Sequence, residues 1–492
     1  MWAAAPGEDW PALLAAAAAH TLAAGRGSVL CLPDHRDVTR VDAALTALLG
    51  PDHHVTLHAE PGPARRYRDF LAVARGARRI VVGTRSAAFA PVRDLGLVVI
   101  WDDGDELHAE PRAPYPHIRE VLALRSEGEG AAYLLGSFGR SVEAHQLLSS
   151  GWAHEIALPR EAVRARVLVG VSGASEHALR RDRFAGTARI PKEAQEAVRW
   201  GLEQGPVLVQ TPRVGYVLRL ACERCREPAR CSACTGPLSL SGPSEPPRCR
   251  WCATPAPEWS CPECGARGLR APVLGDARTA DELGRMFPQV PVLTSSGDRI
   301  RDRVDPTARI VVATPGAEPV ADGGFAVVVL LDAWLALAGD RLRTAEEAVR
   351  RWSNAVGLVR PGGRALAVGD PGHPALQALV RWDQEGFAAR EAAERREARL
   401  PPAARIATLT GRPGAVDDLV TLLELPSSAE VLGPLPPDAA RPGAEDTEVH
   451  RMLLRVPRGD GEALGSAIQE AQRLRSARRL DPVRVQVDPA QI

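Results

Sequence analysis

The sequence predicts an α/β fold with two lobes built on parallel sheets, a two-zinc cysteine module inserted in the second lobe, and a small C-terminal α+β domain. Apolar strands alternate with helices through residues 12–135 and again through 194–368, and polar loops follow the strands, which is typical of a parallel sheet covered on both faces. Four Cys-x-x-Cys pairs interrupt the second series within residues 222–264. Beyond Pro401 and Pro402, strands and helices alternate again over about 100 residues.

The chain of 492 residues is long enough for roughly three domains of ordinary size. We expect residues 1–165 to form the first lobe. Residues 166–220 and 271–385 form the second lobe, residues 221–270 the zinc module, and residues 386–492 the C-terminal domain.

Hydrophobic periodicity and turn residues place the individual elements. In the first lobe we expect helices at 12–24, 38–49 and 65–75, and strands at 28–32, 55–58, 80–82, 97–101 and 131–135. In the second we expect helices at 194–203, 279–287 and 344–356, and strands at 206–210, 216–220, 290–293, 310–313, 326–331 and 364–368. Residues 167–189 resemble a linker, and 375–399 a long exposed helix or helix pair. The C-terminal domain should contain strands at 406–409, 451–456 and 483–487, with helices at 415–423 and 462–475.

The charge balance excludes attraction of the whole chain to nucleic acid, because 61 basic residues face 61 acidic ones. Any DNA contact must be a local patch. Residues 213–270 are mildly basic, and the candidate phosphate contacts there are Arg224, Arg226, Arg230, Arg248 and Arg250. No stretch is apolar enough to cross a membrane, and the N-terminal residues do not form a good signal peptide, so we expect a cytoplasmic protein.

The four cysteine pairs indicate structural zinc, because two Cys-x-x-Cys turns supply the four sulfurs of a closed tetrahedral site. The gaps between the pairs are five, fourteen and eight residues, and the longest leaves room for a hairpin. We therefore favour nested pairing over consecutive or interleaved pairing. It gives an outer zinc on Cys222, Cys225, Cys261 and Cys264, and an inner zinc on Cys231, Cys234, Cys249 and Cys252. Four disulfides are the other alternative, but these are typical of small secreted chains. Trp251 and Trp259 could stack on bases, although packing against the zinc turns is favoured.

Several stretches together resemble one family: residues 77–90 (ARRIVVGTRSAAFA), 94–101 with the acidic cluster that follows, the four cysteine pairs, 373–379 (HPALQAL) and 385–402. They span nearly the whole chain and resemble the PriA family of bacterial primosomal replication-restart helicases. The resemblance implies two RecA-like helicase lobes around an ATP site. It also implies binding to forked DNA or to junctions of single-stranded and duplex DNA. The implied partners are other primosome proteins and the single-stranded-DNA-binding protein.

The phosphate loop of that family has no counterpart here. By the resemblance it falls at residues 6–10 (PGEDW), which lack the lysine that holds the nucleotide phosphates. Lys192 is the only lysine of the chain, and no glycine-rich loop is near it. The carboxylates of Glu8 and Asp9 would repel phosphate.

The magnesium-binding Asp-Glu-Glu-His of the family is replaced by residues 102–105 (DDGD). Asp102 and Asp103 are interpreted as vestigial magnesium or nucleotide residues, and Gly104 stands where a glutamate should position water. A polar turn at the end of a strand is the simpler interpretation. The coupling motif Gly-Ser-Ala-Thr becomes GSFG at 136–139.

In the second lobe, Leu358 and Pro361 occupy the arginine positions of the family, and Arg360 is one residue out of place. An arginine finger alone contributes about 10³–10⁵ in rate. The phosphate-binding loop, its lysine, the carboxylate that orients water and the arginine finger are all missing. We therefore expect no catalytic residues.

The resemblance therefore predicts a degenerate family member: a replication restart protein that binds DNA at stalled or abandoned forks and helps assemble the primosome, without helicase activity and with two Zn²⁺ per chain. The N-terminal DNA-binding region of the family precedes the first lobe, and we expect this chain to lack it. One alternative is an active ATP-dependent 3′–5′ DNA helicase, which requires the missing lysine. Another is a zinc-ribbon scaffold that binds protein and not DNA.

Overall fold

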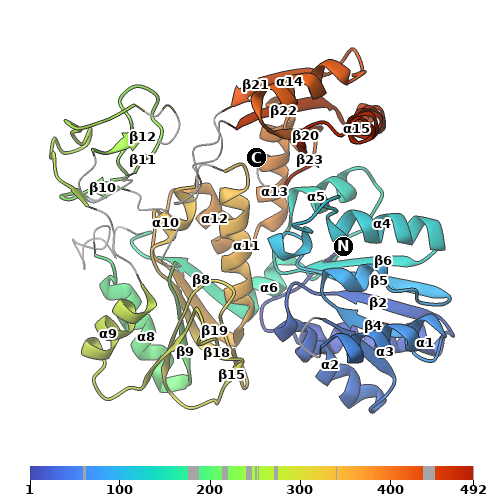
Figure 1. The fold of residues 1–492 in the computed structure, drawn as a ribbon. Helices are drawn as coiled ribbons and strands as arrows, with labels where there is room; N and C mark the ends of the chain where they lie inside the picture. Colours follow the sequence, from blue (N-terminus) through green and yellow to red (C-terminus); the bar gives the residue numbers. More distant parts are fainter. Residues whose placement is uncertain are drawn as a thin grey trace. The chain divides into compact units, whose positions relative to one another are not determined.

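The structure is a computed structural model. It describes residues 1–58, 62–175, 188–212, 220–225, 227–239, 246–249, 252, 254–270, 275–339, 341–435 and 449–490. The chain divides into two compact units (Figure 1). Unit 1 contains Met1–Trp2, Trp10–Glu155 and Ala388–Ile492, and unit 2 contains Ala3–Asp9 and Ile156–Phe387.

Five strands of the seven-stranded first sheet are parallel and lie in the order β3-β4-β2-β5-β6, so the parallel first lobe is confirmed. The elements of this part of the chain are β1 (Trp2–Ala3), α1 (Trp10–Ala23), β2 (Gly27–Cys31), α2 (His35–Leu49), β3 (His54–Leu57), α3 (Pro63–Ala74), β4 (Ile80–Gly83), η1 (Arg85–Phe89), β5 (Leu95–Trp101), η2 (Glu106–His108), α4 (Ile118–Glu129), β6 (Ala132–Ser137) and α5 (Val142–Ser149). Its central strands are wholly buried, as strands covered on both faces must be, and Cys31 lies among them.

The second sheet has the parallel order β14-β16-β9-β18-β19-β8 and carries the core of unit 2. The elements are β7 (Ile156–Ala157), α6 (Arg160–Arg166), β8 (Val167–Val171), α8 (Lys192–Gln204), β9 (Val207–Gln210), α9 (Asp276–Met286), β14 (Val292–Ser295), β15 (Arg303–Val304), β16 (Ile310–Ala313), β17 (Val320–Ala321), β18 (Phe325–Leu330), α10 (Ala333–Leu337), α11 (Thr344–Gly357), β19 (Val359–Ala367), α12 (Pro374–Arg381) and α13 (Gln384–Glu397). The strand expected at 216–220 falls almost entirely outside the described residues.

Two expectations for unit 2 were wrong. Residues 167–171 are not linker but strand β8, at the edge of the sheet, where Val167 lies opposite Gly363. The partner strand is almost two hundred residues away, so no local periodicity marks the pairing. Helix α12 is not exposed, because Leu376 and Leu379 are fully buried against the core. The helix that follows, α13, is charged on its exposed side, but it too buries part of its surface, including Phe387 and Ala388.

The C-terminal residues form a four-stranded antiparallel sheet in the order β21-β22-β20-β23, with two long helices packed on its apolar side chains. Its elements are β20 (Ala404–Gly411), α14 (Pro413–Leu422), β21 (Glu430–Leu435), β22 (His450–Pro457), η3 (Arg458–Asp460), α15 (Gly461–Ala477) and β23 (Arg484–Val487). The small α+β domain is thus confirmed, and β21 is a strand that the sequence analysis missed. Across the described chain, no helix combines the length and apolarity that spanning a bilayer requires.

Candidate metal centres and the segments aligned with a nucleotide site

The cysteine module follows β9 and carries two small antiparallel ladders. Strand β10 (Ala221–Cys222) pairs with β13 (Leu269–Arg270), and β11 (Leu238–Ser239) pairs with β12 (Arg248–Cys249). The four Cys-x-x-Cys pairs adopt one common turn, in which the amide of the first cysteine donates to the carbonyl five residues later. These hydrogen bonds run from Cys222 to Glu227 (2.8 Å), Cys231 to Gly236 (2.8 Å), Cys249 to Thr254 (3.0 Å) and Cys261 to Ala266 (2.9 Å). Each turn brings both thiols of a pair to the same side.

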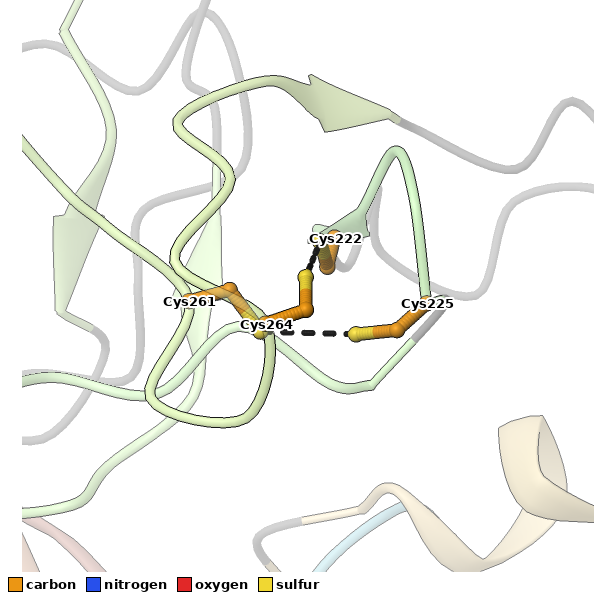
Figure 2. A group of neighbouring side chains, drawn as sticks. All are labelled: Cys222, Cys225, Cys261 and Cys264. Carbon is orange, nitrogen blue, oxygen red and sulfur yellow. Dashed lines mark hydrogen bonds between the residues drawn. The ribbon is translucent and has the colours of Figure 1, made fainter.

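The outer group joins the first and last of these turns. Figure 2 shows Cys222, Cys225, Cys261 and Cys264 facing one another. The Sγ atoms of Cys222 and Cys264 are 3.5 Å apart, and those of Cys225 and Cys261 are 3.4 Å apart. All four sulfur atoms lie within 4.8 Å of one another.

The inner group joins the two middle turns through Cys231, Cys234, Cys249 and Cys252. Its Sγ–Sγ distances are 3.8 Å between Cys231 and Cys252, 3.4 Å between Cys234 and Cys249, and 3.3 Å between Cys234 and Cys252. These two groups of four are the sets that nested pairing assigns to one zinc each, and the assignment stays a prediction that zinc counting tests.

Both groups have the dimensions of a tetrathiolate zinc site. A tetrahedral zinc with Zn–S bonds of about 2.3 Å separates its sulfurs by about 3.8 Å. A disulfide would need about 2.0 Å, and none of the nine cysteines is in one. Donation from the backbone amides of Cys225 and Arg224 lowers the pKa of Cys222 to about 6, whereas burial and the neighbouring sulfurs raise the pKa of Cys225 to about 12. The two thiols of this pair thus share a proton until a metal displaces it. The two groups can therefore hold metal ions, and their all-sulfur chemistry is that of structural zinc.

The aromatic and basic residues of the module have different environments. Trp259 is buried, and its indole Nε1–H donates to the carbonyl of Arg230 at 3.0 Å, so it packs within the module. Arg224, Arg230 and Arg248 have exposed side chains. Of the other candidates, Arg226, Arg250 and Trp251 lie outside the described residues. The arginines stay predictions as DNA contacts.

The segment that aligns with the phosphate loop joins β1 to α1, and its polar groups are already engaged. The amide of Ala5 donates to Glu8 Oε2 at 2.9 Å, and the other Glu8 oxygen lies 3.7 Å from Arg166 Nη1. The amide of Gly7 donates to the carbonyl of Gly357 at 3.0 Å. The Glu8 carboxylate thus accepts the hydrogen bond of a backbone amide that, in a phosphate-binding loop, would be donated to phosphate.

Trp10, the last residue of the same segment, lies in an aromatic cluster of unit 1. Its indole is stacked on Trp101, with the centroids 4.2 Å apart, and Phe138 meets Trp101 edge-on at 5.5 Å. The guanidinium of Arg40 lies 4.6 Å from the centroid of Trp10. The three aromatic side chains are buried. Phe138, which replaces the alanine of the coupling motif, therefore contributes to apolar packing.

The acidic cluster after β5 forms a turn, closed by the amide of Asp105 donating to the carbonyl of Asp102 at 2.9 Å. Asp103 is 1 % exposed, and its Oδ2 accepts from Arg119 Nη1 at 2.9 Å and from Ser141 Oγ at 2.6 Å. The carboxylate of Asp103 is thus engaged in a buried ion pair. Residual magnesium or nucleotide binding by Asp102 and Asp103 is untested.

Sequence analysis missed one unusual carboxyl group near this turn. Burial raises the pKa of Asp37 to about 7, assisted by repulsion from Asp34 and Asp102 and opposed by Arg40 and Arg36. Asp34 caps helix α2, and its side chain accepts from the backbone amides of Arg36 and Asp37. The sequence signal that could have identified Asp37 was its spacing from Asp34 just after strand β2. Functional polar residues of parallel sheets gather at this edge, beyond the carboxyl ends of the strands.

The displaced arginine of the second lobe also has a structural contact. Arg360 Nη1 donates to the carbonyl of Gln204 at 3.1 Å. Arg360 lies against Gly324, where an added Cβ would come within 2.9 Å of the Arg360 backbone nitrogen, and the φ of +83° at Gly324 also favours glycine. Arg360 therefore links β19 to the end of α8.

Comparison with known proteins identifies the family. A family model described as "Primosomal protein N C-terminal domain" matches residues 396–490. The "Probable replication restart protein PriA" of Mycobacterium tuberculosis is 47 % identical over 513 aligned residues, covering 100 % of this chain and 78 % of that protein. The homologue of Mycobacterium leprae is 45 % identical, with 100 % and 77 % coverage. The "Replication restart protein PriA" of Bacillus subtilis is 24 % identical over 79 % of this chain and 50 % of its own length.

Among solved structures, one similar chain is Dbp5 of S. cerevisiae bound to RNA and ADP BeF3. It is 10 % identical, covers 78 % of this chain and 83 % of its own, and has a TM-score of 0.41. RecG bound to a three-way DNA junction is 12 % identical, with 75 % and 40 % coverage and a TM-score of 0.39. The identity with the mycobacterial proteins over the whole chain and the C-terminal match lead to one conclusion: this chain belongs to the PriA family of replication restart proteins.

Proposed function

We propose that this protein is a replication restart factor that binds DNA at stalled or abandoned forks and helps assemble the primosome without helicase activity. Its lobes serve as a scaffold, and two structural zinc ions hold the cysteine module. Membership of the PriA family supports the replication role, because the mycobacterial relatives carry that name.

The segment Ala3–Asp9 is the observation that carries the non-catalytic part of the proposal. In a nucleotide-binding loop, free backbone amides and a lysine surround the phosphates. Here the amide of Ala5 is taken by the carboxylate of Glu8, and the amide of Gly7 by a backbone carbonyl. An incoming phosphate would have to displace a carboxylate of like charge and would find no lysine, so nucleotide binding is disfavoured at this loop.

The remaining catalytic groups support the same conclusion. Gly104 has no side chain to orient water, Asp103 is engaged with Arg119, and Arg360 is engaged with the carbonyl of Gln204. Phosphoryl transfer depends on all of these positions acting together. A protein with this arrangement is suited to bind DNA and partners, and not to hydrolyse ATP.

The DNA-binding part of the proposal rests on the cysteine module. Its exposed arginines Arg224, Arg230 and Arg248 lie on turns fixed by the two metal groups, so they can meet a phosphate backbone without ordering a flexible loop. By the family resemblance, the protein partners are the single-stranded-DNA-binding protein and other primosome components.

Two assays on the purified zinc-loaded chain test the proposal. Fluorescence anisotropy with a labelled forked DNA is measured across a salt series, with an unrelated neutral protein as control. We expect affinity for the fork above that of the control, falling as salt rises. ATP hydrolysis is measured with the same fork, with and without Mg²⁺, and we expect none. Affinity no better than the control would overturn the DNA role, and fork-stimulated turnover would establish the helicase alternative.

A further inference from the structure

Helix α3 of the first lobe presents an exposed face that combines aromatic and basic side chains. Of its twelve residues, Pro63–Ala74, only Val73 is buried. Tyr67 is 65 % exposed and Phe70 is 40 % exposed, although aromatic residues make up only 4 % of the chain. Large aromatic side chains are normally buried, so two of them exposed on neighbouring turns require an explanation.

The two rings lie on one side of the helix, because residues three apart are neighbours on a helical surface. Arginines flank them. Arg66 lies four residues before Phe70 and so on the side of the rings, whereas Arg65 lies on the opposite side of the helix. Arg68 and the C-terminal cap Arg75, seven residues apart, share the adjacent side next to Tyr67. All four side chains are exposed.

The charges on this face are largely uncompensated. Arg65 has a weak surface pair with Asp69, at 3.8 Å. Within the described part of the chain, no ion pair or side-chain hydrogen bond is found for Arg66, Arg68 or Arg75. A surface of exposed aromatic rings and arginines attracts a polyanion that also carries flat apolar groups, such as the phosphates and bases of a nucleic acid.

We propose that this face of α3 is a binding site for single-stranded nucleic acid, with bases stacked on Tyr67 and Phe70 and phosphates paired with Arg66, Arg68 and Arg75. Stacking on aromatic side chains next to basic groups is the general mode of sequence-independent single-strand binding. A duplex fits less well, because its base faces are covered by neighbouring bases. The proposal rests on the proposed function, since a fork offers single-stranded DNA, and it adds a second contact remote in sequence from the cysteine module.

Fluorescence anisotropy with a labelled oligothymidylate strand of about 16 nucleotides tests the site. Tyr67→Ala with Phe70→Ala should weaken binding about thirtyfold or more, because each of the two stacked bases contributes roughly fivefold or more. The conservative pair Tyr67→Phe with Phe70→Tyr keeps both rings and should bind like the parent. Leu124→Ala, which removes an equally exposed apolar side chain from α4, is the matched control.

Arg66→Ala with Arg68→Ala should lower the slope of log affinity against log salt by about 1.4, since two phosphate contacts are lost. All variants should keep the parental thermal midpoint, because the changed side chains are exposed. A double aromatic variant that binds the strand as tightly as the parent would overturn the proposal. If the same variant also lost self-association in sedimentation velocity, the face would instead be a contact between copies of the chain.

The outcome separates this inference from the proposed function. A parent protein that binds forked DNA but shows no affinity for the isolated strand removes the α3 site and leaves the restart role in place. A parent that binds neither removes both.

Discussion

The indole of Trp10 is stacked on the indole of Trp101, with the ring centroids 4.2 Å apart and the planes inclined by only 11°. Trp10 ends the segment that aligns with the family's phosphate loop, and Trp101 is the last residue of β5, directly before the acidic turn. Two positions that border the nucleotide in an active family member are thus joined by an apolar contact. The contact stabilises the first lobe without a ligand.

This stacking predicts a large stability cost for Trp10→Ala. Removing a fully buried indole costs about 3–5 kcal/mol through lost transfer energy and the cavity left behind. Urea denaturation followed by circular dichroism measures the free energy of unfolding. Trp152→Ala serves as control because Trp152 is 41 % exposed, and its loss should cost about 1 kcal/mol or less. A Trp10→Ala protein as stable as this control would contradict the prediction.

The ion pair between Asp103 and Arg119 predicts a second large effect. Arg119→Ala leaves a buried carboxylate without its partner, and we expect a loss of about 3–5 kcal/mol. Arg65→Ala, which removes an exposed partner of Asp69, should change stability by less than about 1 kcal/mol. Asp103→Asn added to Arg119→Ala should recover part of the loss, because the uncompensated charge is gone. No recovery in the double variant would show that the charge is not the cause.

Asp37 predicts a pH dependence of stability. Its folded pKa of about 7 lies above the ordinary value of 3.8, so the folded chain favours the protonated form. Below about pH 4 the group is protonated in both states, and this contribution to stability is fully present. As the pH rises to about 7, the unfolded chain releases its proton first and the contribution is lost.

The neutral variant Asp37→Asn should therefore equal the parent near pH 4 and exceed it at pH 8 by on the order of 2 kcal/mol. Urea midpoints at the two pH values give the comparison. Asp418→Asn, an exposed change on α14, should show no such difference. A parent and an Asp37→Asn variant with parallel pH profiles would disprove the raised pKa.

Zinc counting by emission spectrometry distinguishes the pairing schemes. Under nested pairing, Cys222→Ser with Cys264→Ser disrupts only the outer site, so one of two zinc ions should remain. Cys222→Ser with Cys234→Ser disrupts both sites, so neither should remain. Consecutive pairing predicts the reverse of both results, which makes the two double variants controls for each other.

The basic residues of the module predict a change in salt dependence. Arg248→Ala with Arg250→Ala should reduce the slope of log affinity for forked DNA against log salt by about 1 to 2, because two phosphate contacts would be lost. Arg303→Ala with Arg473→Ala removes two exposed arginines that are paired with Asp322 and Glu470, and this charge-matched control should leave the slope unchanged. An unaltered slope in the double variant would exclude these two arginines as phosphate contacts.

The features predictable from sequence were those encoded locally. A Cys-x-x-Cys turn forms from adjacent residues, so spacing alone indicated two four-cysteine groups before any contact was known. The buried parallel strands were equally visible, because runs such as 97–101 and 326–331 are continuously apolar. The contact between Trp10 and Trp101 could not be predicted, because the two residues are ninety-one positions apart and nothing in either neighbourhood indicates the stack.

The sequence-based predictions failed where a structure depends on residues far apart in the chain, as in edge strands and contacts between side chains. Strand β8 has an ordinary apolar run, but its identity depends on Gly363–Ala367 far along the chain. Residues 375–399 are rich in charge when taken together, so the whole segment was predicted to be exposed. The apolar face of α12, at the start of that segment, was therefore missed. The expectation that Glu8 repels phosphate stays a prediction, and its hydrogen bond to the amide of Ala5 became visible only in the folded turn.

The pairing of β10 with β13 places Ala221 opposite Arg270, so the first and last strands of the cysteine module lie side by side. A cassette whose two ends meet in this way can be transplanted, exchanged or excised without stretching the surrounding sheet. The sequence between the two ends can therefore change in length or composition without altering the distance between those ends.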